Sequence, residues 1–320
     1  MVLNRVQRWM LVSRLLQAVP VLVIATFLVF SLIQLLPGDV AVTLAGDNAT
    51  SARIAEIRAL YGLDRPFLVQ YFSWLGNAAQ GDLSRSLLSG EAVSDTIMRV
   101  FPNTIFVAFY AVVLSVLIGV PLGIFAASKP GSGIDGLVMT LSSVGIALPN
   151  FWIAMILVGA FSLSRPWFPA TGFVSPFESV PQAFWYATLP AIALASSGVA
   201  EVARQLRTSL VEILSSQYVR TLHAKGLPPY RILWKHGLRN VSVNLLTVIG
   251  LLFNRTLAAT VVVEVVFAIP GMGNSIVNAT LQRDFPVVQG MVLMMVLTVI
   301  AINLLTDMLY SILDPRISQQ

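Results

Sequence analysis

The chain consists of long uncharged runs separated by polar segments. Residues 15–36, 104–127, 137–163 and 287–306 each form a run of about 20 residues or more without a charged side chain. A helix needs about 20 apolar residues to cross the roughly 30 Å hydrocarbon core of a bilayer. Each of these runs therefore predicts a membrane-spanning helix.

Two further runs predict spans that are interrupted. Residues 184–200 are fewer and contain Pro190, while residues 241–269 are long enough but include Arg255 and Glu264. With these two, the expected fold is an all-α integral membrane protein with six transmembrane helices. Proline removes a backbone donor inside a helix, so Pro190 and the Pro149–Asn150 pair in the third span predict either a packing kink or a hinge.

Composition supports a membrane protein and narrows its chemistry. The chain is 56% hydrophobic and 11% charged, whereas soluble domains carry about 25% charged residues. It has no cysteine, and its two histidines, His223 and His236, lie in one basic segment without a cluster of carboxylates. Disulfides and thiolate metal sites are therefore excluded, and no metal site is expected.

Neither an enzyme nor a nucleic-acid-binding protein is expected. The sequence has no Gly-x-x-x-x-Gly-Lys-Ser/Thr loop to hold a nucleotide phosphate, and no Ser/His/Asp set or pair of carboxylates inside the spans. The net charge of +5 comes from bases in short segments between apolar runs, and no nucleic-acid motif accompanies them.

The placement of lysine and arginine predicts the orientation. Cytoplasmic segments of membrane proteins are enriched in these residues. With the N-terminus inside, the cytoplasmic side receives residues 1–14, 128–136, 201–240 and 313–320, and the segment 201–240 is especially basic. Both termini are then cytoplasmic, in a plasma (inner) membrane.

The segment from Pro37 to Asn103 is too long for a plain outer loop. Apolar residues at helical spacing predict a helix over 51–61 that ends at Gly62, and a second helix is expected over 66–75. We expect a small extracytoplasmic subdomain here. The predicted organisation is an N-tail at 1–14, a first helix at 15–36, this subdomain at 37–103, a five-helix core at 104–312 and a C-tail at 313–320.

The cytoplasmic segment 201–240 predicts a helix, a break and a second helix. One amphipathic helix should end at Gly226, and a short helix should run from Pro229 to Leu238. The apolar stripe of the first helix consists of Leu206, Leu210, Ile213, Leu214, Tyr218 and Leu222. The segment is either a solvated basic loop that touches anionic lipid or a docking helix for a cytoplasmic partner, and its geometry favours docking.

Within this segment, Tyr218-Val-Arg-Thr-Leu-His-Ala-Lys-Gly226 followed by His236-Gly-Leu-Arg-Asn240 resembles the cytoplasmic Glu-Ala-Ala loop of ABC importer permeases of the dipeptide/oligopeptide type. The glycine of that loop falls on Gly226. Arg220 and Thr221 stand where the general motif begins with Glu-Ala, as is usual in the peptide subgroup, and Leu222 replaces the expected alanine. The resemblance extends to Leu36–Asp39, Tyr61–Pro66, Gly81–Ser86, Val261–Gly290, Asp307–Tyr310 and Asp314–Arg316.

The resemblance implies an importer subunit that forms half of a translocation pathway for dipeptides or oligopeptides. Its implied partners are a second homologous permease, two ATP-binding-cassette ATPase subunits, an extracytoplasmic solute-binding protein and the bilayer. ATP and Mg would bind to the ATPase subunits and no cofactor to this chain. Import of nickel or glutathione by the same permease type stays open. The residues implied to couple to the ATPase are Tyr218, Arg220, Thr221, Ala224, Lys225, Gly226, Arg231, His236 and Arg239.

A second group of residues is expected at the pathway or at the loop that meets the binding protein. Glu264 either contributes to the pathway or holds the following turn, and Arg255 either contacts a peptide carboxylate or pairs with the second permease. The remaining members of the group are Pro270, Gly271, Met272, Gly273 and Asp284.

Two rival classes are weighed against this interpretation. An ion-coupled secondary transporter would favour mid-span carboxylates and an inverted repeat, and the sequence has neither feature in an obvious form. A membrane scaffold or receptor without transport is disfavoured by the interrupted spans and the long docking segment.

Overall fold

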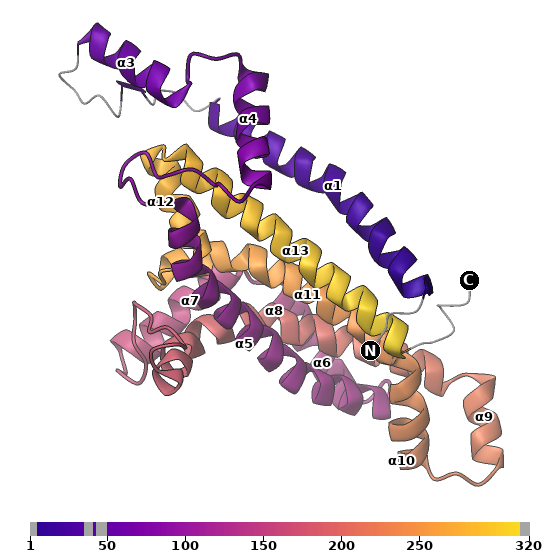
Figure 1. Cartoon of the computed structure of the whole chain (residues 1–320). Helices are drawn as coiled ribbons and strands as arrows, with labels where there is room; N and C mark the ends of the chain where they lie inside the picture. The colour runs from indigo at the N-terminus through magenta and orange to yellow at the C-terminus, as the bar shows by residue number, and fades with distance from the viewer. Residues whose placement is uncertain (1–4, 35–40, 43–49, 314–320) are drawn as a thin grey trace. The chain divides into compact units, whose positions relative to one another are not determined.

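The computed structural model describes residues 5–34, 41–42 and 50–313, and the motif segments Leu36–Asp39 and Asp314–Arg316 lie outside them. The described residues form helices and one isolated bridge between Arg85 and Ala92. The helices, drawn in Figure 1, are α1 (Arg5–Gln34), α3 (Ser51–Tyr61), α4 (Phe67–Ala79), α5 (Val93–Ser128), α6 (Gly133–Ala147), α7 (Asn150–Val158), η1 (Gly159–Leu163), α8 (Val180–Leu214), α9 (Gln217–Ala224), α10 (Pro229–Arg231), η2 (Ile232–Gly237), α11 (Leu238–Val266), α12 (Met272–Gln282) and α13 (Phe285–Leu313).

The chain divides into two compact units. Among the described residues, the first unit contains 5–11, 103–270 and 301–313, and the second contains 12–34, 41–42, 50–102 and 271–300. Helices α1, α5 and α13 contribute residues to both units. The boundaries predicted for a subdomain at 37–103 stay a prediction.

Four helical segments of the described chain are long and apolar enough to cross a membrane, and a fifth span is possible if α6, α7 and η1 count as one. The four are α5, α8, the continuous stretch Pro229–Val266 and Phe285–Tyr310 of α13. The apolar part of α1, Leu16–Leu32, is shorter. The all-helical fold is thus confirmed for the described residues, while the count of six spans stays a prediction.

The expected third span is not one straight helix. Helices α6 and α7 meet at an angle of 94°. Leu148 is extended (φ −81°, ψ 129°) and precedes Pro149, which caps the start of α7. Proline disfavours the helical conformation of the residue before it and cannot donate a backbone hydrogen bond, so the helix ends there. Pro190, in contrast, lies inside α8 without ending it.

Helix α8 is longer than the sequence predicted. The expected span ended at Ala200, but α8 continues to Leu214 and is followed by a new helix, α9, from Gln217. The hydroxyl of Ser216 accepts a hydrogen bond from the backbone N–H of Val219, which caps α9. The single amphipathic helix up to Gly226 was therefore wrong: its stripe is divided between α8 and α9.

The first unit is organised around α8, which packs against α6, α7 and α11. Small residues let its backbone approach α5 closely: an ideal Cβ on Gly119 would lie 2.9 Å from the carbonyl oxygen of Val199, and one on Gly123 would lie 2.8 Å from that of Ala203. Such close approach favours helix association where no hydrophobic effect acts between helices.

The second unit holds the segment that follows α1. Helix α3 coincides with the predicted 51–61 helix, and Gly62 ends it in the left-handed region (φ 65°), as expected. The predicted 66–75 helix appears as α4 and extends to Ala79.

Helix α4 packs on α1 through a buried tyrosine. The hydroxyl of Tyr71 donates to the carbonyl oxygen of Val23 at 3.0 Å and lies 3.0 Å from the hydroxyl of Thr26. Its ring meets Phe27 and Phe30 edge to face. The aromatic contacts bury apolar surface while the hydroxyl keeps its hydrogen bonds, so α4 is held in one position on α1.

We expect Gly123→Ala to destabilise the protein because the new methyl group would press on backbone rather than on a side chain that can move. The free energy of unfolding should fall by about 1–3 kcal/mol, measured as a lower thermal midpoint in detergent. Gly136→Ala is the matched control, since a Cβ there meets nothing within 4 Å. Equal midpoints for the two variants would contradict the close packing of α5 on α8.

Candidate coupling segment and charged sites

The predicted coupling residues lie on a helical hairpin formed by α9, α10 and η2, except Arg239, which is the second residue of α11. The hairpin projects beyond the ends of α8 and α11 (Figure 1). Val219 of α9 and Ile232 of η2 are each only 1% exposed. The expected second helix, from Pro229 to Leu238, is present, but it continues through η2 directly into α11.

Gly226 sits at the turn of the hairpin in the left-handed region (φ +77°). The backbone N–H of Gly226 donates to His223 at 2.9 Å, and that of Leu227 donates to Leu222 at 3.2 Å. These bonds satisfy carbonyl groups at the end of α9. A Cβ at Gly226 would meet nothing within 4 Å, so the glycine is required by its backbone angle and not by lack of space.

Two predicted coupling residues close the base of the hairpin. The hydroxyl of Tyr218 lies 2.8 Å from Nδ1 of His236. Their rings meet edge to face at 6.0 Å. This contact links the start of α9 to η2 and fixes the spacing between the two arms.

The outer surface of the hairpin is basic and aromatic. The docking interpretation requires exposed side chains, and those exposed on the hairpin are Arg220, Thr221, Ala224, Lys225 and Arg231. Arg239, at the start of α11, is exposed as well. Tyr230 and Trp234, which the motif did not single out, are 64% and 61% exposed. Aromatic residues and arginine are enriched at protein interfaces, so this composition favours a docking surface over a solvated loop.

A buried carboxylate ties the turn between α5 and α6 to α8. The carboxylate of Asp135 accepts hydrogen bonds from Nε of Arg207 at 2.9 Å and from Nη2 of Arg207 at 2.6 Å. It also accepts one from the backbone N–H of Gly131 at 2.8 Å. The side chain of Asp135 is 5% exposed. The paired, bidentate geometry positions the last two turns of α8, which lead into the hairpin.

Glu264, expected at the pathway or the following turn, is fully buried. Its carboxylate accepts the hydroxyl of Thr104 at 2.6 Å. The turn itself is held by Asn103, whose amide donates to the carbonyl oxygen of Pro270 at 2.9 Å, and by the N–H of Ile269, which donates to the carbonyl oxygen of Glu264 at 2.9 Å. Asn103 and Thr104 are two polar residues at the edge of an apolar run, and that position was the only sequence signal for them.

Arg255 is paired within the chain. Its Nη1 donates to both carboxylate oxygens of Glu201, at 2.9 and 3.0 Å. The arginine side chain is nonetheless 70% exposed and that of Glu201 is 23% exposed. Arg255 and Glu264 have different surroundings, since residues nine apart lie about 180° from each other around a helix.

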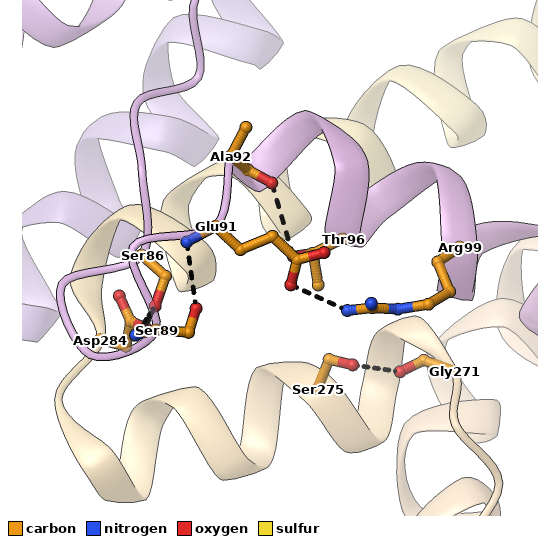
Figure 2. Close-up of polar contacts among 9 residues, drawn as sticks. All are labelled: Ser86, Ser89, Glu91, Ala92, Thr96, Arg99, Gly271, Ser275 and Asp284. Atoms are coloured by element: carbon orange, nitrogen blue, oxygen red, sulfur yellow. Dashed lines mark hydrogen bonds and ion pairs between the residues drawn. The ribbon is translucent and has the colours of Figure 1, made fainter.

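Asp284 joins two segments of the second unit (Figure 2). It precedes α13 and is 5% exposed. One carboxylate oxygen accepts the hydroxyl of Ser86 and the other accepts the N–H of Leu87 at 3.0 Å. The Ser86 oxygen in turn accepts the N–H of Ser89 at 3.0 Å, so this carboxylate orders the segment before α5.

The remaining members of the second group lie around the start of α12. Met272 and Gly273 are buried, and the carbonyl oxygen of Gly271 accepts a hydrogen bond from the hydroxyl of Ser275 (Figure 2).

The segment before α5 also carries an ion pair. A hydrogen bond from Arg99 at 3.0 Å lowers the pKa of Glu91. Because the pKa of Glu91 is lower in the folded state, the pair stabilises the fold at neutral pH. This stabilisation is lost as the pH falls through the folded-state pKa.

Comparison with known proteins decides the family. Residues 119–319 match the family described as binding-protein-dependent transport system inner membrane component, and residues 7–108 match its N-terminal family. The chain is a member of this permease family. A Brucella abortus protein named as a peptide transport system permease is 40% identical over 310 residues, 96% of this chain and 98% of that protein.

Two further comparisons extend this result. The permease is 37% identical over 306 residues to the glutathione transport system permease protein GsiC of Escherichia coli, covering 96% of this chain and 97% of that one. An inward-facing structure of the MetNI methionine ABC transporter has a chain with a TM-score of 0.56 at 15% identity, covering 68% of this permease and 96% of that chain. At that identity, the likeness concerns the fold alone.

We expect Asp135→Asn to weaken the permease because it leaves the guanidinium of Arg207 without its charged partner. A hydrogen bond to a charged group is worth about 1.5–3 kcal/mol, so the thermal midpoint in detergent should fall. The exposed aspartate variant Asp64→Asn serves as control. If both variants melt together, the pair does not hold α6 to α8.

We expect Asp284→Ala and Ser86→Ala each to speed tryptic cleavage after the exposed Arg85 by about tenfold or more, since opening of the segment becomes easier. Ser89→Ala should cleave at the wild-type rate. The aspartate variant leaves the cleaved sequence unchanged, so a normal rate for it would refute the role of Asp284.

Proposed function

We propose that this permease forms half of the translocation pathway of an ATP-driven importer of dipeptides or oligopeptides. It pairs with a second homologous permease in the plasma membrane, and both of its termini are cytoplasmic. Two ATP-binding-cassette subunits bind and hydrolyse MgATP, and an extracytoplasmic binding protein delivers the solute. The permease itself performs no catalysis and holds no cofactor.

The exposed hairpin of α9, α10 and η2 carries this proposal. Its two arms are fixed to each other by Tyr218 and His236, and its basic and aromatic surface is offered to a partner. An ATPase that docks there would act on α8 at one arm and on α11 at the other, because the hairpin joins these two helices. Opening and closing of the ATPase pair could then alternate the access of the pathway.

The peptide class rests on the relatives. The Brucella abortus protein is named for peptide transport, and the Escherichia coli protein is named for transport of glutathione, itself a peptide. A small peptide is therefore the proposed solute, and glutathione is the alternative that a relative directly supports. Nickel stays the other alternative.

Two carboxylates that lie in spans are already paired within the chain, which does not favour a secondary transporter. Glu201 accepts hydrogen bonds from Arg255. Glu264, a carboxylate in a span, is buried against Thr104. A rigid cytoplasmic hairpin with an exposed aromatic surface is not needed for ion coupling. Family membership supports the importer class instead.

A graded series at Gly226 tests the coupling role. Because only the backbone angle is constrained, the effect should follow the tolerance of each side chain for positive φ: Gly226→Asn mild, Gly226→Ala intermediate and Gly226→Val severe. The left-handed region costs about 1–2 kcal/mol for ordinary residues. In proteoliposomes with the complete importer, we expect the ratio of peptide imported to ATP hydrolysed to fall about tenfold or more for Val.

Membrane insertion and assembly are measured for each variant of this series, so that a folding defect is distinguished from a loss of coupling. The amount of permease that co-purifies with its partner permease should be unchanged for all three variants. Wild-type coupling in Gly226→Val would refute docking at this hairpin.

A further inference from the structure

Polar side chains lie away from the ends of three apolar helices of the first unit. The polar patch that they form consists of Glu201 on α8, Asn254 and Arg255 on α11, and Asn303 on α13. Its members form two hydrogen-bonded pairs: Arg255 donates to Glu201, and the amide of Asn254 donates to Asn303 at 2.8 Å. The two pairs meet at the adjacent residues Asn254 and Arg255 of α11. Three helices that qualify as spans by length and composition thus each contribute to one patch, well inside their ends.

The exposure of this patch is incompatible with a lipid environment. Arg255 is 70% exposed, and Asn303 is exposed. A charged side chain that faces hydrocarbon is expensive, so ionisable residues in spans face a water-filled cavity or a partner. We therefore infer that this face borders water inside the membrane. A hydrophilic solute would cross the membrane through such a water-filled space.

The patch also retains hydrogen-bonding capacity. A guanidinium has five donors, and Arg255 uses only Nη1 toward Glu201. The other edge of the guanidinium, Nε with Nη2, has the fork geometry that binds a carboxylate bidentately.

We propose that Arg255 binds the carboxylate of the passing solute, with Glu201 as the positioning residue that orients the guanidinium. This inference rests on the proposed function, and it names a chemical class: peptides with a free C-terminal carboxylate. Glu201 keeps the empty patch close to neutral, so the site binds the carboxylate weakly enough to release it. Contact of this face with the second permease is the competing arrangement.

The test uses the complete importer in proteoliposomes, with binding protein loaded to saturation with either alanyl-phenylalanine or its C-terminal amide. The wild type should import the free acid faster than the amide. We expect Arg255→Gln to lower import of the acid by roughly tenfold, the loss of a charge-assisted hydrogen bond pair, with little change for the amide. Arg255→Lys keeps the positive charge but loses the planar pair of donors, and Glu201→Gln weakens the contact that orients the guanidinium. For both variants, the ratio of acid to amide import should lie between those of the wild type and Arg255→Gln.

Arg165→Gln is the matched control. Arg165 is an exposed arginine that lies over the ring of Trp167, in the segment before α8 and outside the patch, and its removal should leave the ratio of acid to amide import unchanged.

An unchanged ratio in Arg255→Gln overturns the proposal, whether both solutes are imported normally or both rates fall together. Loss of the second permease on co-purification also overturns it, in favour of an interface. Failure of the wild type to import either solute with ATP would instead refute the proposed function. If Arg255→Gln itself does not accumulate in the membrane, the ratio measured for Arg255→Lys decides.

Discussion

The close approach of α5 to α8 is the constraint on which the rest of the first unit depends. Gly119 and Gly123 place the backbone of α5 almost against the carbonyl groups of α8. Gly198 continues this contact from the other side, because a Cβ there would lie 2.3 Å from the hydroxyl oxygen of Ser115. With its backbone seated in this way, α8 can pack α6, α7 and α11 around it and still carry Glu201 and Arg207 to their partners.

Three buried carboxylates of this permease form hydrogen bonds between segments that are distant in sequence. Asp135 fixes a turn to α8, Glu264 fixes α11 to α5, and Asp284 fixes the start of α13 to the segment before α5. Each of these three buried carboxylates accepts hydrogen bonds, as burial requires. Arg255 differs because its pair leaves most of the side chain exposed.

The sequence predicted what periodicity and single-residue rules determine. Hydrophobic runs located the helices, and the 51–61 helix with its terminal glycine was correct to the residue. It failed where the outcome depends on local competition. A cap at Ser216 divides an apolar stripe that is continuous in sequence, and the extended residue before Pro149 turns one expected span into two helices at 94°. The partners of Arg255 and Asp284 could not be found, because they lie 54 and about 198 residues away.

Helices α10, η2 and α11 follow one another without a break from Pro229 to Val266 and form one long rod. Its 38 residues correspond to about 57 Å at 1.5 Å per residue. The end near Glu264 is pinned by Thr104, so a tilt of the rod has its pivot there and its largest sweep at the hairpin. For any tilt about that contact, the displacement along the helix grows with distance from it, so Arg255 moves much less than the hairpin does.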